Sequence, residues 1–93
     1  MAELLSDEEI TSRLEGSDWT REGEEIVRDY KLEDFAGAIS FVNRVAEIAE
    51  AANHHPDILV HGYNQVRLSL STHSAGGLTE LDFAMARRFD DAL

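Results

Sequence analysis

The spacing of hydrophobic and polar residues changes several times along the chain, and the first change predicts a short helix. Residues 6–9, Ser-Asp-Glu-Glu, have the form of a capping box, in which a hydroxyl and a carboxylate bind backbone amides reciprocally. Ile10 and Leu14 follow at a four-residue step and give one narrow apolar stripe. Gly16 then favours a stop, so we expect a helix that ends at about Leu14.

The next segment has the pattern of two strands. Trp19 opens a polar stretch, and Gly23 is typical of a turn before a second apolar run. We expect strands at roughly 18–22 and 25–32. Because Ile26 and Val27 are consecutive, the second strand alternates imperfectly and its register stays open.

From Asp34 to about Asn53 the period becomes that of a helix, with Asp34 as its cap. Small residues such as Gly37 and Ala38 would let this helix approach a sheet closely. Its predicted buried stripe, at three- and four-residue steps, consists of Phe35, Ile39, Val42, Ala46, Ala49 and Ala52.

The last part of the chain predicts a hairpin followed by a helix. Residues 58–63 and 66–73 alternate like strands, with residues 64–65 as the turn. Residues 79–82, Thr-Glu-Leu-Asp, form a second capping signature. In the second strand the side facing one way contains Val66, Leu68, Leu70 and Thr72, while His73 lies on the other side.

The element order is therefore helix, two strands, helix, two strands, helix. This order predicts an α+β fold, with a four-stranded antiparallel sheet and helices packed on one face. No repeat, low-complexity tract or linker interrupts the chain, so we expect residues 1–93 to form a single domain.

Charge and composition narrow the possible partners. A formal net charge of −11 argues against nucleic acid and anionic membrane as direct partners. The absence of cysteine excludes disulfides, thiolate catalysis and thiolate metal sites. The N-terminal residues carry acids rather than the positive charge of a secretory signal, and no apolar run approaches the roughly 20 residues that span a bilayer. We expect a soluble cytoplasmic protein.

The candidate functional residues include a pair of adjacent histidines. Pro56 disfavours helical geometry at the preceding residue, so His54 and His55 should occupy a fixed, exposed corner just after the long helix. Glu50 lies one turn back from His54 and could reach its ring, and the predicted hairpin could return His73 to the pair. Converging imidazoles indicate acid/base chemistry or a metal, since imidazole exchanges protons near neutral pH.

Two other interpretations compete with acid/base chemistry. Adjacent histidines at a turn rarely aim both rings at one ion, and no His-x-x-x-His spacing is present, so we expect no metal. Solvated surface histidines without a function remain the simpler alternative for an isolated pair.

A longer pattern favours the acid/base interpretation. The run Glu50-x-x-x-His54-His55-Pro56, then Tyr63, His73 and Asp82, resembles the signature of the pterin-4a-carbinolamine dehydratases. Residues 70–73 and 77–80 are also similar to that family, so the resemblance covers about residues 5–90. It departs from the family at Asn53, where an acid often precedes the paired histidines.

The resemblance implies a reaction and a set of roles. Water would be removed from 4a-hydroxytetrahydrobiopterin to give quinonoid dihydropterin, in tetrahydrobiopterin recycling, without a metal or organic cofactor. His54 and His73 would transfer protons, and His55, a third catalytic histidine, would chiefly hold the pterin. The implied substrate-binding positions are Glu50, His55, Pro56 and Asp82. Of these, Pro56 would only shape the corner, and a helix cap is the favoured explanation of Asp82.

The resemblance also implies a homodimer or homotetramer that assembles through sheet edges and helices. The alternative function is a non-catalytic dimerisation or regulatory interaction module of the same fold. The intact set of histidines favours the enzyme, because a scaffold has no physical need of it.

Overall fold

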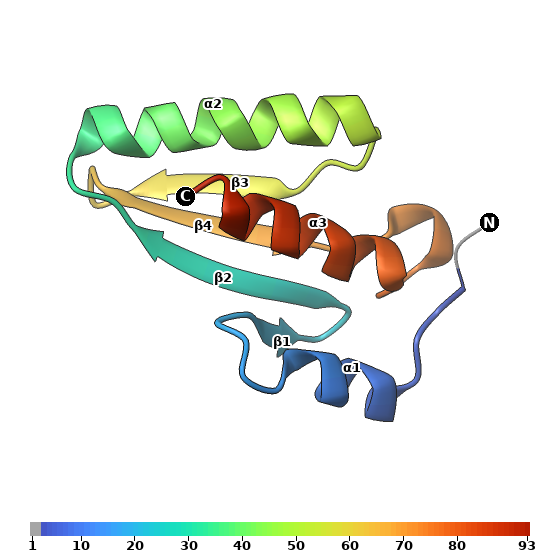
Figure 1. Cartoon of the computed structure of the whole chain (residues 1–93). Coiled ribbons are helices and arrows are strands. Elements are labelled where there is room, and N and C mark those ends of the chain that lie inside the picture. The colour runs from blue at the N-terminus through green and yellow to red at the C-terminus, as the bar shows by residue number, and fades with distance from the viewer. Residues whose placement is uncertain (1–2) are drawn as a thin grey trace.

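The computed structural model describes residues 3–93, which form a four-stranded antiparallel sheet and its covering helices (Figure 1). The elements follow the predicted order and confirm the predicted fold class. They are α1 (Asp7–Leu14), β1 (Thr20–Glu22), β2 (Glu25–Lys31), α2 (Phe35–Ala52), β3 (Asp57–His61), β4 (Gln65–Leu70), the short 3-10 helix η1 (His73–Ala75) and α3 (Glu80–Asp91).

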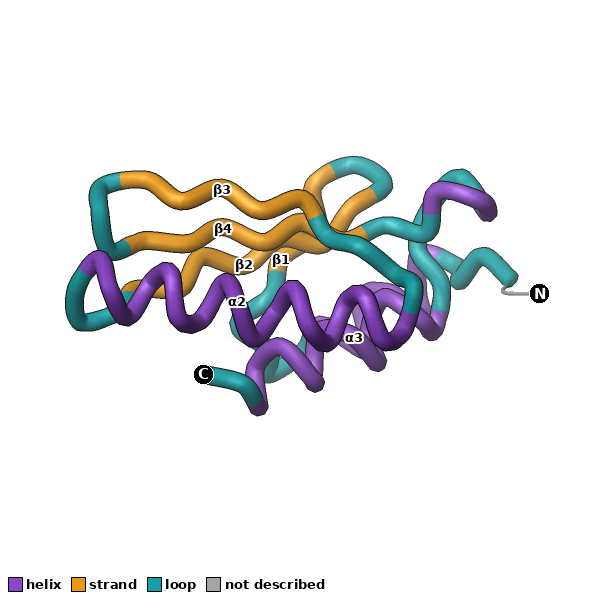
Figure 2. Tube along the Cα trace, turned by 90° about the horizontal axis from the view of Figure 1, so that it is seen from above, coloured by secondary structure: helices purple, strands orange, loops and turns teal. Residues whose placement is uncertain are grey.

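The strands lie in the order β1-β2-β4-β3, so β4 is central and β3 forms an edge. The register that the sequence left open is settled by the pairs Ile26 with Leu70 and Tyr30 with Val66 between β2 and β4. In the view of Figure 2, α2 and α3 lie on the same side of the sheet. The core between these layers contains Ile10, Ile26, Phe41, Val45, Val66, Leu68, Leu70 and Phe89.

Local capping explains where each helix begins. The Ser6 hydroxyl accepts the Glu9 amide at 3.1 Å, and the Asp34 carboxylate accepts the Gly37 amide at 2.6 Å. Thr79 and Asp82 complete a capping box at the start of α3. All these caps were predicted from the sequence.

The predicted buried face of α2 was wrong except at Ala49, which is buried as expected. Phe35, Ile39 and Ala46 are exposed, and the buried side consists of Ala38, Phe41, Val45 and Ala49. Helix α2 is apolar over most of its circumference, so two stripes with the same spacing compete and the spacing alone does not choose between them. One of these apolar stripes therefore faces outward.

The hairpin also differs from its prediction. The turn between β3 and β4 spans residues 62–64, with φ angles of 55° at both Gly62 and Tyr63, so Asn64 lies in it as predicted but Gln65 already belongs to β4. Two consecutive positive φ angles suit the tight turns that match strand twist. At the other end, β4 stops at Leu70, and His73 begins η1 instead of ending the strand.

No helix within residues 3–93 is both long enough and apolar enough to cross a membrane.

Candidate active site

The corner after α2 sets the direction of the two adjacent histidines. Asn53 adopts the left-handed conformation, with φ 51° and ψ 43°, and ends the helix. The His54 amide then donates to the Ala49 carbonyl at 3.1 Å. Asparagine tolerates this conformation better than most residues with a side chain. The expected end of the helix is confirmed, and the paired histidines leave it in a defined direction.

His54 is held by a buried carboxylate. Its Nε2 lies 2.8 Å from Oδ1 of Asp82, with the His54 side chain 11% exposed and the Asp82 side chain 0% exposed. An ionised carboxylate has no proton to give, so Nε2–H is the donor in this pair. The neutral ring therefore keeps its other nitrogen, Nδ1, as a proton acceptor.

Asp82 is itself fixed by two threonines. Its Oδ2 accepts the Thr79 backbone amide at 2.9 Å and the Thr72 hydroxyl at 2.8 Å. With His54, three donors surround this carboxylate at the N-terminus of α3, where the helix dipole also favours negative charge. Asp82 thus serves as the predicted cap and supports His54 at the same time.

The hydroxyl protons of the two threonines have one consistent arrangement. The Leu81 amide donates to Thr79 Oγ1 at 3.2 Å, and the two hydroxyl oxygens lie 2.7 Å apart. Because the Thr72 proton is directed to Asp82, the Thr79 hydroxyl must donate to Thr72. A chain of donors therefore leads from the first turn of α3 to the carboxylate that holds His54.

Glu50 contacts His55 rather than His54. Its Oε2 lies 3.0 Å from His55 Nε2, and both side chains are largely exposed, at 75% and 54%. The expectation that Glu50 reaches His54 was wrong, because the left-handed residue Asn53 turns the chain and Asp82 occupies Nε2 of His54. An exposed pair of this kind contributes little to stability.

His73 joins the pair through the turn after β4. Thr72 forms a bridge with Gly77, and its carbonyl accepts the amides of Ala75 and Gly76 at 3.0 Å each. The three predicted histidines thereby line one cavity of about 210 Å³. Its lining consists of Asn53, His54, His55, Ser71, Thr72, His73 and Ser74.

The remaining residues of the sequence signature lie outside this lining. Pro56 follows the corner and starts the approach to β3, and His61, which does not belong to the signature, is exposed at the far end of that strand. Tyr63, 66% exposed, lies in the turn beyond it. Five residues of extended strand separate that turn from Pro56, a length of about 16 Å.

The supporting role of Thr72 could not be predicted from the sequence. Its alternation predicted an inward-facing residue, and it is 3% exposed, but no local pattern shows that its hydroxyl meets Asp82, ten residues later. Within residues 3–93 no group of three or more histidine, cysteine, aspartate or glutamate side chains is arranged to hold a metal ion.

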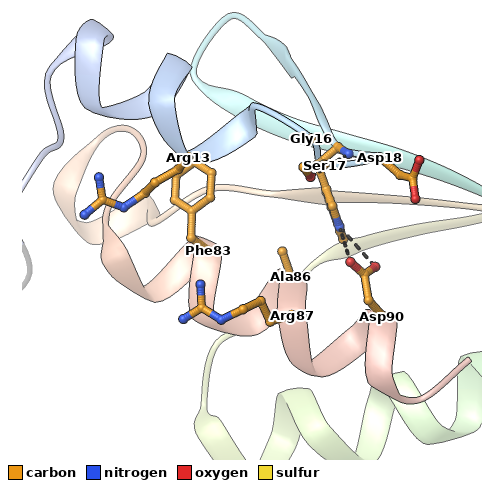
Figure 3. Close-up of a pocket in the computed structure, with 9 residues that line it drawn as sticks. Arg13, Gly16, Ser17, Asp18, Phe83, Ala86, Arg87 and Asp90 are labelled. Atoms are coloured by element: carbon orange, nitrogen blue, oxygen red, sulfur yellow. Dashed lines mark hydrogen bonds between the residues drawn. The ribbon is translucent and has the colours of Figure 1, made fainter.

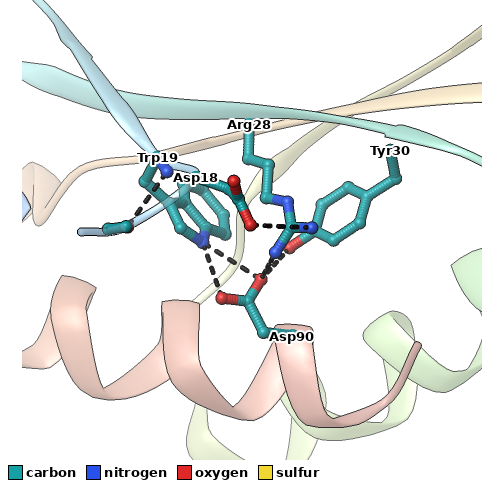
Figure 4. Close-up of polar contacts among 6 residues, drawn as sticks. Asp18, Trp19, Arg28, Tyr30 and Asp90 are labelled. Atoms are coloured by element: carbon teal, nitrogen blue, oxygen red, sulfur yellow. Dashed lines mark hydrogen bonds and ion pairs between the residues drawn. The ribbon is translucent and has the colours of Figure 1, made fainter.

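A second polar cluster, which was not predicted, is centred on Asp90 of α3 (Figure 4). Asp90 accepts hydrogen bonds from Tyr30 at 2.6 Å, Arg28 at 2.7 Å and the Trp19 indole at 3.1 Å. Burial, with Asp90 as a further cause, raises the pKa of the Tyr30 hydroxyl far above its usual range, so this hydroxyl stays a donor. The cluster ties β2 and the segment before β1 to α3, and its residues do not line the histidine cavity.

The fold and cavity together define a small α+β protein with three histidines gathered on one cavity. The family model described as "Pterin 4 alpha carbinolamine dehydratase" matches residues 3–92, and the chain belongs to this family. The resemblance inferred from the sequence signature is therefore confirmed.

Relatives of similar length support the same assignment. A protein of Chloroflexus aurantiacus is 53% identical over 90 residues, covering 96% of each chain, and one of Nocardia farcinica is 53% identical over 90 residues, covering 96% of this chain and 94% of the other. Both carry the name pterin-4-alpha-carbinolamine dehydratase as a provisional assignment.

Solved structures share the fold. The crystal structure of a transcriptional coactivator/pterin dehydratase from Brucella melitensis matches with a TM-score of 0.87 and 36% identity, covering 95% of this chain and 96% of the other. A pterin dehydratase-like protein, identified as a RuBisCO assembly factor in the alpha-carboxysome, matches with a TM-score of 0.68 and 23% identity, covering 81% and 88%. At that identity the second match supports the fold alone.

Proposed function

We propose that this chain removes water from a 4a-hydroxytetrahydropterin to give the quinonoid dihydropterin, as in tetrahydrobiopterin recycling. The observation that carries the proposal is the meeting of His54, His55 and His73 on one cavity, with a buried carboxylate behind His54. Family membership supplies the substrate class.

The reaction needs one group that donates a proton to the substrate and one that accepts a proton from it. The C4a hydroxyl leaves as water after it receives a proton, the N5–H proton goes to a base, and the C4a–N5 double bond forms. No electron acceptor is required, so the atoms and charges balance without a cofactor. Imidazoles suit both transfers, and we assign them to His54 and His73.

The other site residues have supporting roles in this proposal. His55, more exposed and paired with Glu50, is suited to hold the pterin at the mouth of the cavity. Pro56 keeps the corner in its shape. Asp82 was expected to contact substrate, but its complete burial favours a positioning role through His54.

The test is a dehydration assay with purified protein and a freshly generated 4a-hydroxytetrahydropterin. His54→Ala and His73→Ala should each lower the catalysed rate by about 10²–10⁴-fold. The control is His61→Ala, because His61 is exposed on β3 and outside the cavity. Retention of wild-type rates in either cavity variant, with dehydration limiting the assay, would contradict the role proposed for that histidine.

We also propose that the chain forms a homodimer or homotetramer. Support comes from the unpaired edge of β3, which exposes Leu59 at 54%, and from the outer stripe of α2, which exposes Phe35 at 55%. Open strand edges and apolar patches favour pairing with another chain. Leu59→Lys and Phe35→Lys should each reduce the mass measured by light scattering. A monomeric mass for the wild-type protein would refute the proposal.

The alternative function is a non-catalytic dimerisation or regulatory module. The description of the Brucella melitensis structure as a transcriptional coactivator as well as a pterin dehydratase keeps this alternative open for the family. The assay above separates the two functions, because an interaction module would show no catalysed dehydration with its histidines intact.

A further inference from the structure

A second cavity lies apart from the histidines, between the α1–β1 connection and α3 (Figure 3). Its volume is about 280 Å³, against about 210 Å³ for the histidine cavity, and the two share no lining residue. Small-molecule sites span about 300–1,000 Å³, so this cavity lies at the lower end and suits only a ligand the size of a single ring. Its lining consists of Arg13, Gly16, Ser17, Asp18, Trp19, Phe83, Ala86, Arg87 and Asp90.

The inner wall of this cavity is apolar and aromatic. Trp19, Phe83 and Ala86 are 3%, 5% and 4% exposed, so only small parts of them reach the opening. The Trp19 indole N–H is already bonded to Asp90, and Asp90 also serves Arg28 and Tyr30. This wall therefore offers a narrow strip of aromatic surface, and the polar atoms of Trp19 and Asp90 are already satisfied.

The rim carries two arginines. In the view of Figure 3, Arg13 and Arg87 lie on either side of Phe83. Arg13 pairs with Glu80, whereas Arg87 makes no hydrogen bond or ion pair with any side chain of residues 3–93. Two carboxylates, Asp18 and Asp90, also line the cavity, but both already pair with Arg28, so Arg87 is the charged lining side chain without a partner among residues 3–93.

We propose that this second cavity binds a small aromatic carboxylate. The ring would lie against Trp19 and Phe83, since aromatic faces and edges pack favourably. The carboxylate would bind the free guanidinium of Arg87, whose planar fork matches a carboxylate, with Arg13 adding positive charge nearby. The Ser17 hydroxyl accepts the Trp19 amide at 3.0 Å and keeps its own proton for a second bond to the ligand.

The chain contains one tryptophan, and this makes a direct test possible. The Trp19 indole N–H gives a single isolated signal in a ¹H–¹⁵N spectrum, and it lies at the cavity wall. Titration of the full-length protein with sodium benzoate should shift this signal along a saturable curve. Benzamide has the same ring without the charge, and inorganic phosphate has charge without a ring, so each should bind at least about tenfold more weakly, as loss of a charged hydrogen bond predicts.

Two neighbouring arginines supply matched variants. Arg87→Gln should weaken benzoate binding by about tenfold. Arg88→Gln removes the same charge from the same helix but lies outside the lining, so it should change the affinity less than about twofold. A linear, unsaturable shift, equal binding of benzamide, or equal effects of the two variants would each overturn the proposal. The ligand-free Trp19 signal of both variants should match the wild type, which verifies that the cavity wall is intact.

Discussion

At the scale of single residues, Thr72 supports the site through Asp82. Thr72→Val keeps the shape of the side chain but removes the hydroxyl that donates to Asp82. We expect the turnover number to fall about tenfold, the value for one lost hydrogen bond to a charged group, while KM changes little. Thr72→Ser restores the hydroxyl and should recover most of the turnover.

A merely structural role for Thr72 would give a different result. The ¹⁵N shifts of the His54 ring report which nitrogen carries the proton. They should show more exchange between the Nδ1–H and Nε2–H tautomers in Thr72→Val than in the wild type or in Thr72→Ser. Loss of stability with unchanged ring shifts would show that Thr72 only packs.

His55 should act on binding more than on chemistry. His55→Ala removes an exposed ring from the cavity lining and leaves the His54–Asp82 pair in place. We expect KM for the pterin to rise more than about fivefold, as for one lost hydrogen bond, while the turnover number stays within about threefold. A fall in turnover as large as that of His54→Ala would place His55 in the proton transfer itself.

At the scale of elements, Asp90 ties β2 and the segment before β1 to α3. Asp90→Asn removes the negative charge that pairs with Arg28 and turns one acceptor oxygen into a donor, and the Nε of Arg28 is already buried without a hydrogen bond. Because Asp90 remains about a third exposed, we expect a loss of about 1–3 kcal/mol in the free energy of unfolding. Each kcal/mol corresponds to about 4–8 °C in Tm for a domain of this size.

The neighbouring acid provides the control for this measurement. Asp91→Asn changes the same charge in the same last turn, but Asp91 is exposed and makes no ion pair within residues 3–93. Its Tm should move by no more than about 2 °C, as for an ordinary surface substitution. Equal shifts for the two variants would show that net charge, not the cluster, sets the effect.

Helix caps and strand alternation were predictable because they depend on residues a few positions apart. Ser6, Asp34 and Thr79 each cap a helix as expected, and the paired histidines leave α2 where Pro56 required. The face of α2 was not predictable, because Phe35 and Phe41 belong to stripes of equal spacing. Only the packed sheet decides which stripe is buried.

Two further pairings could not be predicted, because they join residues that are far apart in the sequence. Trp19 and Asp90 are 71 positions apart, and His54 and Asp82 are 28 apart. Their pairing depends on where α3 packs, which no local pattern specifies. The three histidines could be grouped from the sequence because a single hairpin returns one of them to the other two.

At the scale of the whole molecule, the strong negative charge should have little effect on pterin binding. A pterin ring is planar and uncharged near neutral pH, and surface charges are screened over about 8 Å at physiological salt. Affinity for a dihydropterin should therefore change less than about twofold between low and high salt. A steep dependence would mean that charged groups dominate the cavity, contrary to the proposed reaction.

Helix α3 carries both Asp82, which holds His54, and Asp90, which holds the indole of Trp19. It is also synthesised after every strand of the sheet and after the three cavity histidines. The hairpin can bring the histidines together earlier, but His54 gains its supporting carboxylate only when α3 docks. During refolding, the tryptophan signal and the capacity to turn over substrate should therefore recover at the same time, however early the sheet has formed.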